Sequence, residues 1–517
     1  MADWPPKDLE PRYFADNVHD TIYVHQPLCV LIDRPEFQRL RSIRQLSVVH
    51  LVYPTANHDR FTHSLGTYHL AFKFVSKLQS KFPDLDITSA EHLCVSVAAL
   101  MHDIGHGPFS HLFGGAFRAA VRENWEHEKI SRQLVESIMR EESVKEAFKA
   151  YLGDGEIYET NIKFIQELIH SKKFPKTLDQ ARNEMSSKEE REKWAKENWQ
   201  PKGRDISRSF LFDIVSNDFD SHDVDKYDYM LRDAKFTGVS IALRPMNIDR
   251  IMEHAKVLLD PDFRFRRIAY AMKVARNDIA SVGEARQRLH DVVYQHLTVK
   301  IIEKMFVKIF LKINNHMKFR GSSGDLYKLS EIHQDIHAYV QVDDTILNEV
   351  YRSEKPELHE ARSIMDKILK REIPMKLVQC NYSKSTFPTP NKIPDLDTVY
   401  NSIESELRSQ LPEKLQDDVF LIKRQLSKGS ESSMHPLREV LVYDNRDARN
   451  GINIDEGRHL NEEDICIRTT VDASVFGLAL FVSRHLPQEQ CQEIKEKFNE
   501  ITAEKGLRSD DNKGGGS

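Results

Sequence analysis

A cluster of histidine and aspartate side chains stands at the end of an apolar segment, VSVAALMHDIGHGPFSHLF, at residues 95–113. His102 and Asp103 follow the apolar run directly, and His106 and His111 come shortly after it. Imidazole nitrogens and carboxylate oxygens are ligands of transition-metal ions, and burying a carboxylate without such a partner is costly. The cluster therefore predicts a metal site with further histidines beside it.

The residues around this cluster predict a buried helix that ends in a turn. Thr88 and Glu91 have the spacing of a capping box at a helix start. Apolar residues then recur at helical spacing on one face: Leu93, Val97, Leu100 and Met101. Gly105 and Pro108 end the helix, so that His106 is expected on a turn beside its inner end.

Two residues that are distant in the sequence complete a possible ligand set. His63 lies in the loop sequence RFTHS, and Asp225 lies in VDKYDY. Two histidines with two carboxylates suit iron, manganese, zinc or nickel and do not select among these metals. Spacing alone would not single out either residue, because a lone histidine or aspartate is more often a packed or capping group.

Basic and aromatic residues cluster in the same segments. Arg60 precedes His63, and Lys226 follows Asp225 directly. One long helix is predicted over residues 280–313, and three residues recur at every fourth position along it: Arg286, His290 and Tyr294. A cationic stripe on a core-forming helix indicates an anionic ligand, whereas a solvated face that makes salt bridges is the alternative.

The composition describes an ordinary globular protein. The 517 residues suffice for about two or three domains, and the net charge of −6 gives no overall indication of nucleic-acid or membrane binding. No stretch of about 18 apolar residues occurs, and the N-terminus lacks a secretory pattern. The cysteines lack CxxC spacing, which argues for a reducing compartment and against a cysteine-bound zinc: Cys29, Cys94, Cys380, Cys466 and Cys491. A cytoplasmic or nuclear location is expected.

The remaining pattern predicts mostly helices, followed by a mixed C-terminal region. A helix is expected from Pro35 to about Leu46, capped by Asp33. Residues 175–205 are rich in lysine and glutamate and are expected to form an exposed, mobile insertion. Short β-like runs, KLVQC, DVFLIKRQL and EVLVYD, follow from about residue 373, before a last helix near residues 487–504.

Several of these segments, in order, resemble one known family. DRPEFQRLRSIRQL, DRFTHSLG, ALMHDIGHGPFSHLF, DVDKYDYMLRD and RLHDVVYQH are similar to motifs of the HD-domain deoxynucleoside triphosphate triphosphohydrolases, and weaker similarity covers most of residues 12–500. The resemblance is nearest to the animal members that carry a SAM domain, for which this sequence has no room at its N-terminus. It implies a mostly helical fold: an HD-domain catalytic core with an N-terminal regulatory segment at residues 1–325, a smaller α+β lobe for oligomerisation and regulation at 326–505, and a flexible tail at 506–517.

The resemblance also implies roles for individual residues. The metal ligands fall on His63, His102, Asp103 and Asp225. The catalytic residues fall on His106, His111 and His127, together with Asp225. Residues that hold the triphosphate match Arg60, Lys226 and Arg286. Residues around the sugar and base match Gln45, Leu46, Tyr229, Asp233, His290, Tyr294 and Gln295. A regulatory GTP site at a subunit interface matches Arg12, Asp33, Gln38 and Arg41.

The implied activity is hydrolysis of a deoxynucleoside triphosphate (dNTP) to the deoxynucleoside and inorganic triphosphate. It would use one transition-metal ion in the HD site, Mg²⁺ on the nucleotide phosphates, and GTP as effector of a homo-oligomer, either dimer or tetramer. One alternative is another HD-type phosphohydrolase, acting on a nucleoside monophosphate or an alarmone. The second is a non-enzymatic scaffold that binds nucleic acid, which nothing in the sequence specifically indicates; a degenerate scaffold should have lost metal ligands, and this chain keeps all four.

The sequence also departs from the family pattern. An aspartate of the family corresponds to Gly114, which removes a carboxylate expected beside the catalytic histidines. Polar or basic nucleotide contacts of the vertebrate enzyme are replaced by Ala15, Met272 and Leu297, while Arg250 and His296 are kept. The second, deoxynucleotide half of the regulatory site is therefore expected to be weakened or lost.

Overall fold

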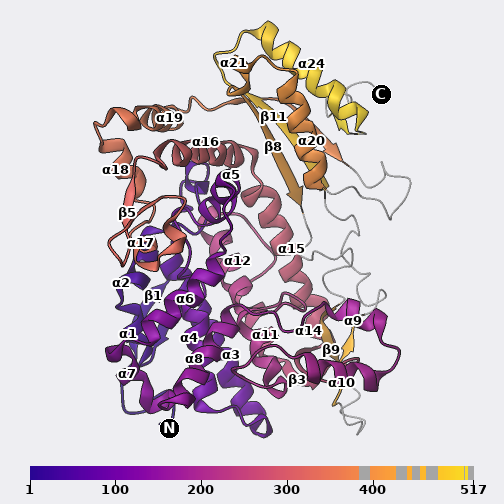
Figure 1. Cartoon of the computed structure of the whole chain (residues 1–517). Helices are drawn as coiled ribbons and strands as arrows, with labels where there is room; N and C mark the ends of the chain where they lie inside the picture. Colours follow the sequence, from indigo (N-terminus) through magenta and orange to yellow (C-terminus); the bar gives the residue numbers. More distant parts are fainter. Residues whose placement is uncertain (383–395, 427–438, 445–454, 461–474, 506, 510–517) are drawn as a thin grey trace.

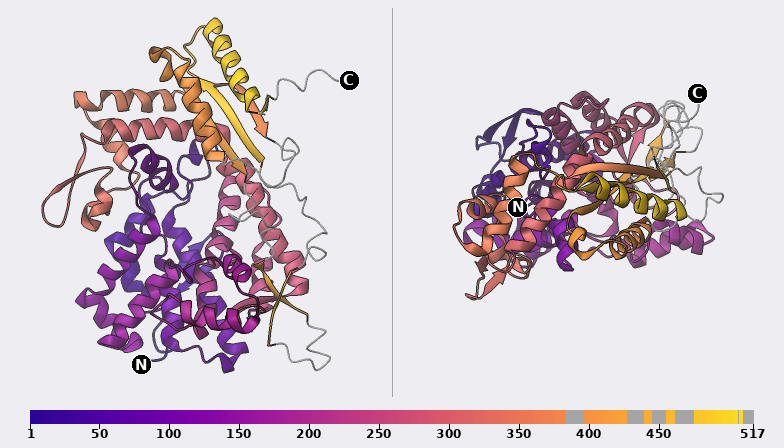
Figure 2. Two further views of the ribbon diagram at one scale, coloured as in Figure 1. Left: turned by 45° about the vertical axis from the view of Figure 1, so that its right-hand side comes forward. Right: turned by 90° about the horizontal axis from the view of Figure 1, so that it is seen from above.

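The structure is a computed structural model that describes residues 1–382, 396–426, 439–444, 455–460, 475–505 and 507–509 (Figure 1). A large helical body is built around one continuous hydrophobic core, and a smaller lobe with its own core lies at the top of Figure 1. The left-hand view in Figure 2 shows the same division. The predicted class, a mostly helical HD-type core with a smaller α+β lobe, is confirmed.

The body is a stack of helices around two central ones. Helix α4 packs on α3 and α8, and α3 packs on α12. These elements and their neighbours are α3 (Arg60–Lys81), α4 (Ser89–Met101), α6 (His127–Met139), α7 (Glu142–Leu152), α8 (Glu156–Ile169) and α12 (Val224–Thr237). Helix α4 has the predicted capping box between Thr88 and Glu91, and its residues from Ala90 to Met101 are buried. Such a helix holds its C-terminal residues firmly inside the core.

The predicted helix from Pro35 to Leu46 is shorter than expected, and its predicted cap is wrong. Helix α2 (Pro35–Gln38) continues only as a 3-10 turn to Ser42, and Arg34, not Asp33, precedes it as the N-cap. The chain then extends, because Gln45 N donates to His58 O at 3.1 Å and Arg60 N donates to Ile43 O at 2.9 Å. Those bonds to the segment before α3 replace the helical ones.

The predicted single helix over residues 280–313 is also wrong. The structure has α15 (Ala280–Leu289), a π-helical turn (His290–Tyr294) and then α16 (Leu297–Ile313). His296 is extended, and its Nδ1 accepts a hydrogen bond from Thr298 N at 3.2 Å, which caps α16. Gly283 lies inside α15 without breaking it.

Residues 175–205, for which an exposed insertion is expected, contain two helices. These are α9 (Leu178–Glu184) and α10 (Lys188–Asn198), each with a capping box. A small hydrophobic cluster fixes them to the hairpin of β3 (Ala255–Leu259) and β4 (Arg266–Ala271), and its buried members are Phe174, Leu178, Ala181, Ala195, Phe263 and Phe265. The charged surface of the segment therefore covers a small core of its own.

The C-terminal lobe is an antiparallel sheet covered by two helices on one face. The strand order is β12-β7-β11-β8, with bounds β7 (Met375–Tyr382), β8 (Val419–Leu426), β11 (Val475–Val482) and β12 (Arg508–Ser509). Helices α20 (Leu396–Ser409) and α24 (Gln488–Glu504) pack on it through Ile403, Leu407 and Phe498. The strands predicted for KLVQC and DVFLIKRQL and the last helix are confirmed.

The run EVLVYD forms a strand, but in another sheet. Strand β9 (Leu441–Tyr443) pairs in parallel with β4 of the body, in the order β10-β9-β4-β3, where β10 is Arg458–His459. The core of the body also extends past residue 325, to Ile368, and the core of the lobe begins near Met375. The chain thus leaves the body near residue 373, and residues 440–443 and Leu460 return to its core.

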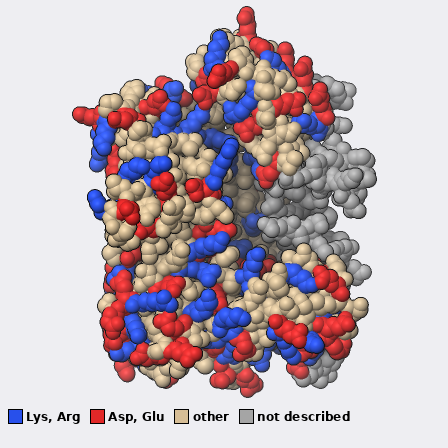
Figure 3. Space-filling model, in the orientation of Figure 1, with Lys and Arg blue, Asp and Glu red and all other residues tan. Residues whose placement is uncertain are grey.

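The surface and the cysteines give few functional signals. Basic and acidic side chains are interspersed on the face shown in Figure 3. Cys29, Cys94, Cys380 and Cys491 are buried free thiols, while Cys466 and the tail at 510–517 lie outside the described residues. Among the helices that the structure describes, none is long and apolar enough to cross a membrane.

Candidate active site

Four side chains that are far apart in the sequence bring their ligand atoms together inside the body. His63 Nε2 lies 3.1 Å from Asp225 Oδ1 and 3.4 Å from Asp103 Oδ2. His102 Nε2 lies 3.5 Å from Asp225 Oδ1 and 3.4 Å from Asp103 Oδ2. Ligands bound to one transition-metal ion at about 2.1 Å are separated by roughly 3.0–3.5 Å, and each histidine nitrogen lies at such a distance from both carboxylates.

The hydrogen bonds of the two histidines leave the right nitrogen atoms available for a metal. His63 Nδ1 donates to Asp228 Oδ2 at 2.7 Å, and His102 Nδ1 donates to Ala99 O at 2.9 Å. Both Nε2 atoms are buried, and neither has a hydrogen-bond partner among the residues that the structure describes. Since buried polar atoms are rarely left unpaired, this arrangement fits a bound metal.

Helix ends position all four ligands. His63 lies in the first turn of α3, where Asp59 caps the helix by accepting from Thr62 N, so its predicted place in a loop is wrong. His102 is the C-cap of α4, as predicted, and Asp103 follows it. Asp225 lies in the first turn of α12. Three separate helices therefore contribute to one site.

Three further histidines form a second layer beside Asp103. His106 Nε2 lies 3.3 Å from Asp103 Oδ1, and the rings of His106 and His127 stack at 3.9 Å. The ring of His111 lies 5.2 Å from that of His106, at nearly a right angle. Burial lowers the pKa of His106 and lowers that of His127 to about 4.

The turn that carries His106 and His111 has an unusual backbone. Phe109 and Ser110 both have positive φ, at 56° and 53°, a conformation that costs about 1–3 kcal/mol for residues other than glycine. Phe109 N donates to Asp344 Oδ1 at 2.6 Å, and Ser110 Oγ donates to Arg44 O at 2.7 Å and accepts from Arg60 Nε at 2.9 Å. Bonds from three distant segments thus stabilise the turn.

A cavity of about 390 Å³ opens beside the four ligands. Many of the residues predicted for substrate binding and catalysis line it: Gln45, Leu46, Arg60, His106, His111, His127, Asp225, Tyr229, Asp233, His290, Tyr294 and Gln295. Tyr294 donates to Asp233 Oδ2 at 2.6 Å, and His58 Nε2 donates to Asp233 Oδ1 at 2.7 Å. These bonds fix the aspartate at the cavity wall.

Two of the three cationic residues predicted to hold a triphosphate are not among the residues that line this cavity. Lys226 Nζ contacts Asp223 Oδ2 at 2.9 Å, and Arg60, which lines the cavity, donates to Asp103 Oδ2. Burial raises the pKa of Tyr229 to about 12, and the nearby charges of Lys226 and Arg286 oppose that shift. Both cations therefore lie close to Tyr229 and to the cavity edge.

Comparison with known proteins agrees with this geometry. The HD domain model matches residues 60–195, which include three of the four ligands. Deoxynucleoside triphosphate triphosphohydrolase SAMHD1 of Gallus gallus is 33% identical over 451 residues, which cover 86% of this chain and 68% of that protein. The corresponding protein of Bos taurus is 31% identical over 451 residues (86% and 71%), and that of Homo sapiens is 35% identical over 409 residues (78% and 60%). The chain belongs to the SAMHD1 family. It spans 60–71% of the length of these three relatives.

The residues matched to the regulatory site of the SAMHD1 family lie together near the surface. Arg12 holds both carboxylate oxygens of Asp33, at 2.6 and 2.7 Å. Arg41 Nε donates to Gln38 Oε1 at 2.8 Å, and the Arg41 guanidinium lies 3.5 Å from the centre of the Phe61 ring. The sequence predicted that Asp33 caps α2. In the structure Asp33 pairs with Arg12 instead.

Two residues at which the sequence is expected to depart from the regulatory site of the family lie in hydrophobic surroundings. Met272 is 8% exposed and belongs to the core of the body. Leu297 packs on a cluster between α16 and the sheet of the lobe, formed by Ile301, Phe420, Ile422, Ala479 and Phe481. Both positions thus contribute packing and offer no cationic group.

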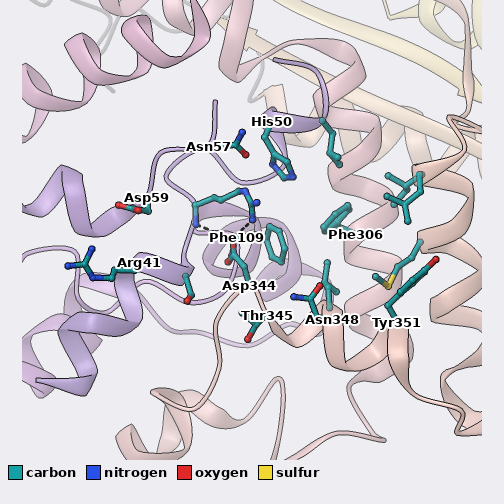
Figure 4. Close-up of a pocket in the computed structure, with 17 residues that line it drawn as sticks. Arg41, His50, Asn57, Asp59, Phe109, Phe306, Asp344, Thr345, Asn348 and Tyr351 are labelled. Atoms are coloured by element: carbon teal, nitrogen blue, oxygen red, sulfur yellow. Dashed lines mark hydrogen bonds and ion pairs between the residues drawn. The ribbon is translucent and has the colours of Figure 1, made fainter. Parts of the chain in front are cut away.

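A second cavity, of about 500 Å³, lies on the other side of the turn that carries His106 and His111 (Figure 4). Figure 4 shows Phe109 and Asp344 at its centre, with Phe306 and Tyr351 along one wall. Arg41 is the one residue predicted for a site in this SAMHD1-family chain that also lines this cavity. The bond from Ser110 to Arg44 O joins its wall to the turn of the first cavity.

Sequence reasoning missed several residues of the site. Ser47, Val49, Lys300 and Glu303 line the first cavity, and no motif marks them. Asp228, which holds His63, could have been found from its position three residues after Asp225 on a helix, since residues at that spacing share a face. Glu128 also lies beside the site, with its Oε2 3.1 Å from His127 Nδ1.

Proposed function

We propose that this protein hydrolyses deoxynucleoside triphosphates to the deoxynucleoside and inorganic triphosphate, with a metal ion in the HD site and regulation by GTP. One observation carries the proposal. Four ligand atoms from His63, His102, Asp103 and Asp225 converge beside a 390 Å³ cavity lined by the residues expected around a nucleotide. The printed names of the SAMHD1 relatives, which describe dNTP triphosphohydrolases, support the same substrate class.

The proposed metal ligands are His63, His102, Asp103 and Asp225. Their mixed nitrogen and oxygen set suits iron, manganese, zinc or nickel. When bound, such an ion supplies Lewis-acid stabilisation of charge on a phosphoryl oxygen. Mg²⁺ on the nucleotide phosphates would be a separate ion that enters with the substrate.

The surrounding residues have distinct tasks in this proposal. Arg60, Lys226 and Arg286 offset negative charge on the triphosphate, which lowers the cost of bringing it into a buried site. His106, His111 and His127 line the cavity beside the metal ligands, and one of them would deliver the proton to the leaving 5′ oxygen of the deoxyribose. Burial keeps the pKa of His127 near 4, so its ring is neutral at neutral pH before substrate binds.

Around the nucleoside, Gln45 and Asp233 offer polar atoms, while Leu46 and Tyr294 offer apolar surface. We expect Leu46 and Tyr294 to close against the 2′ carbon of the sugar. A ribose hydroxyl there would be crowded and left without a partner, at a cost of about 1–3 kcal/mol. The cavity would therefore select deoxyribonucleotides.

The regulatory proposal concerns Asp33, Gln38 and Arg41. A carboxylate can accept from guanine N1 and N2 and discriminates against adenine, which lacks that donor pair. In the structure Arg12 occupies both oxygens of Asp33, so guanine would have to displace or share that fork. The homo-oligomer, dimer or tetramer, would then form at this surface.

The decisive experiment identifies the products. Metal-loaded protein is incubated with each dNTP, with and without GTP, and the products are separated by chromatography. Intact inorganic triphosphate and a deoxynucleoside are expected, and the His102→Ala, Asp103→Ala double variant should release neither. Release of phosphate or diphosphate instead, or turnover of nucleoside monophosphates alone, would show another HD-type phosphohydrolase.

A further inference from the structure

The N-terminal hairpin reaches the metal ligand His63 through one buried carboxylate. Strands β1 (Arg12–Asp16) and β2 (Asp20–Val24) form the hairpin, and its turn carries His19. His19 Nε2 donates to Asp228 Oδ1 at 2.7 Å. His63 Nδ1 donates to the other oxygen, Oδ2, also at 2.7 Å. The two histidines thus share the two oxygens of Asp228.

An arginine ties the same carboxylate to the turn a second time. Arg232 Nε donates to Asp228 Oδ2 at 2.9 Å, and its Nη2 donates to Oδ1 at 3.0 Å. Arg232 Nη1 also donates to Asp16 Oδ2 at 2.7 Å. Asp16 Oδ1 in turn accepts from the backbone N of Val18 and of His19, each at 2.9 Å, which closes the turn. The turn and the metal ligand are therefore parts of one hydrogen-bonded network.

This network is buried, so its bonds do not compete with water. The exposed fraction of the side chain is 6% for His19, 4% for Asp16, 1% for Arg232 and zero for Asp228. Gly66 on α3 leaves the room that it needs, since a Cβ there would lie 1.9 Å from Asp228 Oδ1. In such surroundings a missing donor leaves an unpaired buried acceptor, which the structure must relieve by moving other groups.

The contacts of His63 show how a movement of Asp228 would reach the metal site. Its Nδ1 is fixed by Asp228, and only then does its Nε2 lie between Asp103 and Asp225, at 3.4 and 3.1 Å. Asp228 accepts four donated bonds, two from the histidines and two from Arg232. Without the bond from His19, Asp228 Oδ1 keeps only the bond from Arg232 Nη2, so the carboxylate would turn toward Arg232 and the ring of His63 would follow it.

We propose that His19 is a positioning residue for the metal centre: through Asp228 it orients His63, so that docking of the N-terminal hairpin sets the affinity for the metal ion. The inference rests on the proposed function only in that a metal binds at His63. Carboxylates that orient ligating histidines commonly affect metal affinity by about 10–100-fold when altered. His19 stands one residue further out, on a segment that the ligand motifs do not include.

The test measures metal binding, not turnover. Apparent Kd values for Mn²⁺ and Zn²⁺ are determined by competition with a chromogenic chelator for the wild type, His19→Ala and His19→Gln, alongside thermal unfolding. We expect His19→Ala to raise Kd about tenfold, while His19→Gln, whose side-chain amide can donate to Asp228, stays within about threefold. If His19→Ala does not fold, His19→Leu fills the space without a donor and should show the same tenfold loss.

His92→Ala is the matched control. His92 is a buried histidine of the same region, packed on Trp4 and Phe72 at 4.8 and 5.0 Å between rings, and it does not contact Asp228. This variant should lower the unfolding temperature without changing Kd. An unchanged Kd in folded His19→Ala, or an equal loss in His92→Ala, overturns the inference. A wild-type protein that binds neither ion would instead overturn the metal-dependent function.

Discussion

Glu128 Oε2 lies 3.1 Å from His127 Nδ1, while the other ring nitrogen of His127 faces Asp103 Oδ1 at 3.9 Å. His127 thus stands between two carboxylates, one at the metal site and one outside it. The family pattern places an aspartate at the position of Gly114, in the π-helical turn Leu112–Phe117 that follows His111. In this chain the carboxylate beside one of the three proposed catalytic histidines comes from α6 and contacts His127.

Glu128→Gln should therefore slow turnover. The amide keeps the size of the side chain but cannot stabilise a protonated imidazole, so kcat for dNTP hydrolysis should fall about tenfold, part of the roughly 10²–10⁴-fold effect of general acid–base catalysis. KM should change little, because Glu128 does not line the cavity. Initial rates over a range of dATP concentrations provide both constants, and wild-type kcat in this variant would remove Glu128 from the mechanism.

Gly114→Asp tests whether the missing aspartate is a loss that Glu128 offsets. A Cβ at Gly114 meets no atom within 4 Å, so the side chain fits without displacing its surroundings. We expect little change in kcat in the wild-type background and partial recovery in the Glu128→Gln background. A large increase in kcat from Gly114→Asp alone would indicate that Glu128 does not replace the missing aspartate and that the wild-type enzyme is slow because it lacks this carboxylate.

Removal of two metal ligands should abolish both metal content and activity. In the His102→Ala, Asp103→Ala variant, two of the four ligands are gone and Arg60 loses its partner Asp103. Metal per chain, measured by plasma mass spectrometry, should fall to background, and turnover should fall with it. Circular dichroism checks that the variant is folded. Full activity without bound metal would contradict the proposed mechanism.

The sugar prediction concerns Leu46. If its side chain closes the cavity against the 2′ carbon, kcat/KM for dATP should exceed that for ATP in the wild type by about tenfold or more, and Leu46→Ala should reduce that ratio. Val49→Ala removes apolar volume elsewhere in the same cavity and should keep the ratio. Equal kcat/KM values for ATP and dATP in the wild type would refute the steric explanation.

Stability should depend on pH through Asp213. Burial raises the pKa of this carboxyl to about 7; its Oδ2 accepts from Ile268 N, while its Oδ1 is buried without a hydrogen bond. A folded-state pKa above the unfolded value stabilises the protein at low pH, and that contribution is lost as pH rises from about 4 to 7, by up to about 1.4 kcal/mol per unit. Asp213→Asn keeps an acceptor for Ile268 and should flatten this dependence. Denaturant unfolding at pH 5, 6 and 7 compares the slopes, and identical slopes would contradict the prediction.

Assembly should depend little on a deoxynucleotide. Leu297 and Met272 stand in hydrophobic surroundings at positions where the family resemblance implies polar or basic nucleotide contacts, and each charge-assisted contact to a phosphate that is lost is worth about 1.5–3 kcal/mol. Sedimentation is measured without nucleotide, with GTP, and with GTP plus a non-hydrolysable dNTP. We expect the oligomer already in the first or second sample, and Asp33→Asn should remove any effect of GTP. An oligomer that appears only in the third sample would count against this prediction.

The sequence could predict the elements that local patterns determine. The capping box of α4, the position of His102 at its end and the strands near residues 375 and 419 follow from spacing and capping chemistry. The break at His296 could not be predicted, because a histidine side chain caps α16 there. The early end of the helix after Ser42 could not be predicted either, because it depends on backbone hydrogen bonds to the segment before α3. His63 and Asp225 became ligand candidates through resemblance alone, since tertiary structure brings them to His102.

The bonds between Arg39, Tyr339 and the catalytic turn have a consequence for how the chain is made. Arg39 donates to Ile104 O and His106 O and also to Val342 O, and Tyr339 donates to Gly105 O at 2.8 Å. Asp344 also accepts from Phe109 N. Tyr339, Val342 and Asp344 follow the turn by more than 200 residues, so the ribosome adds them long after it. A nascent chain released at residue 325 would hold every metal ligand and still lack the groups that shape the turn between them. The groups that shape the turn are therefore added late in translation, and a fragment that ends near residue 370 would still lack residues 440–443 and Leu460, which belong to the core of the body.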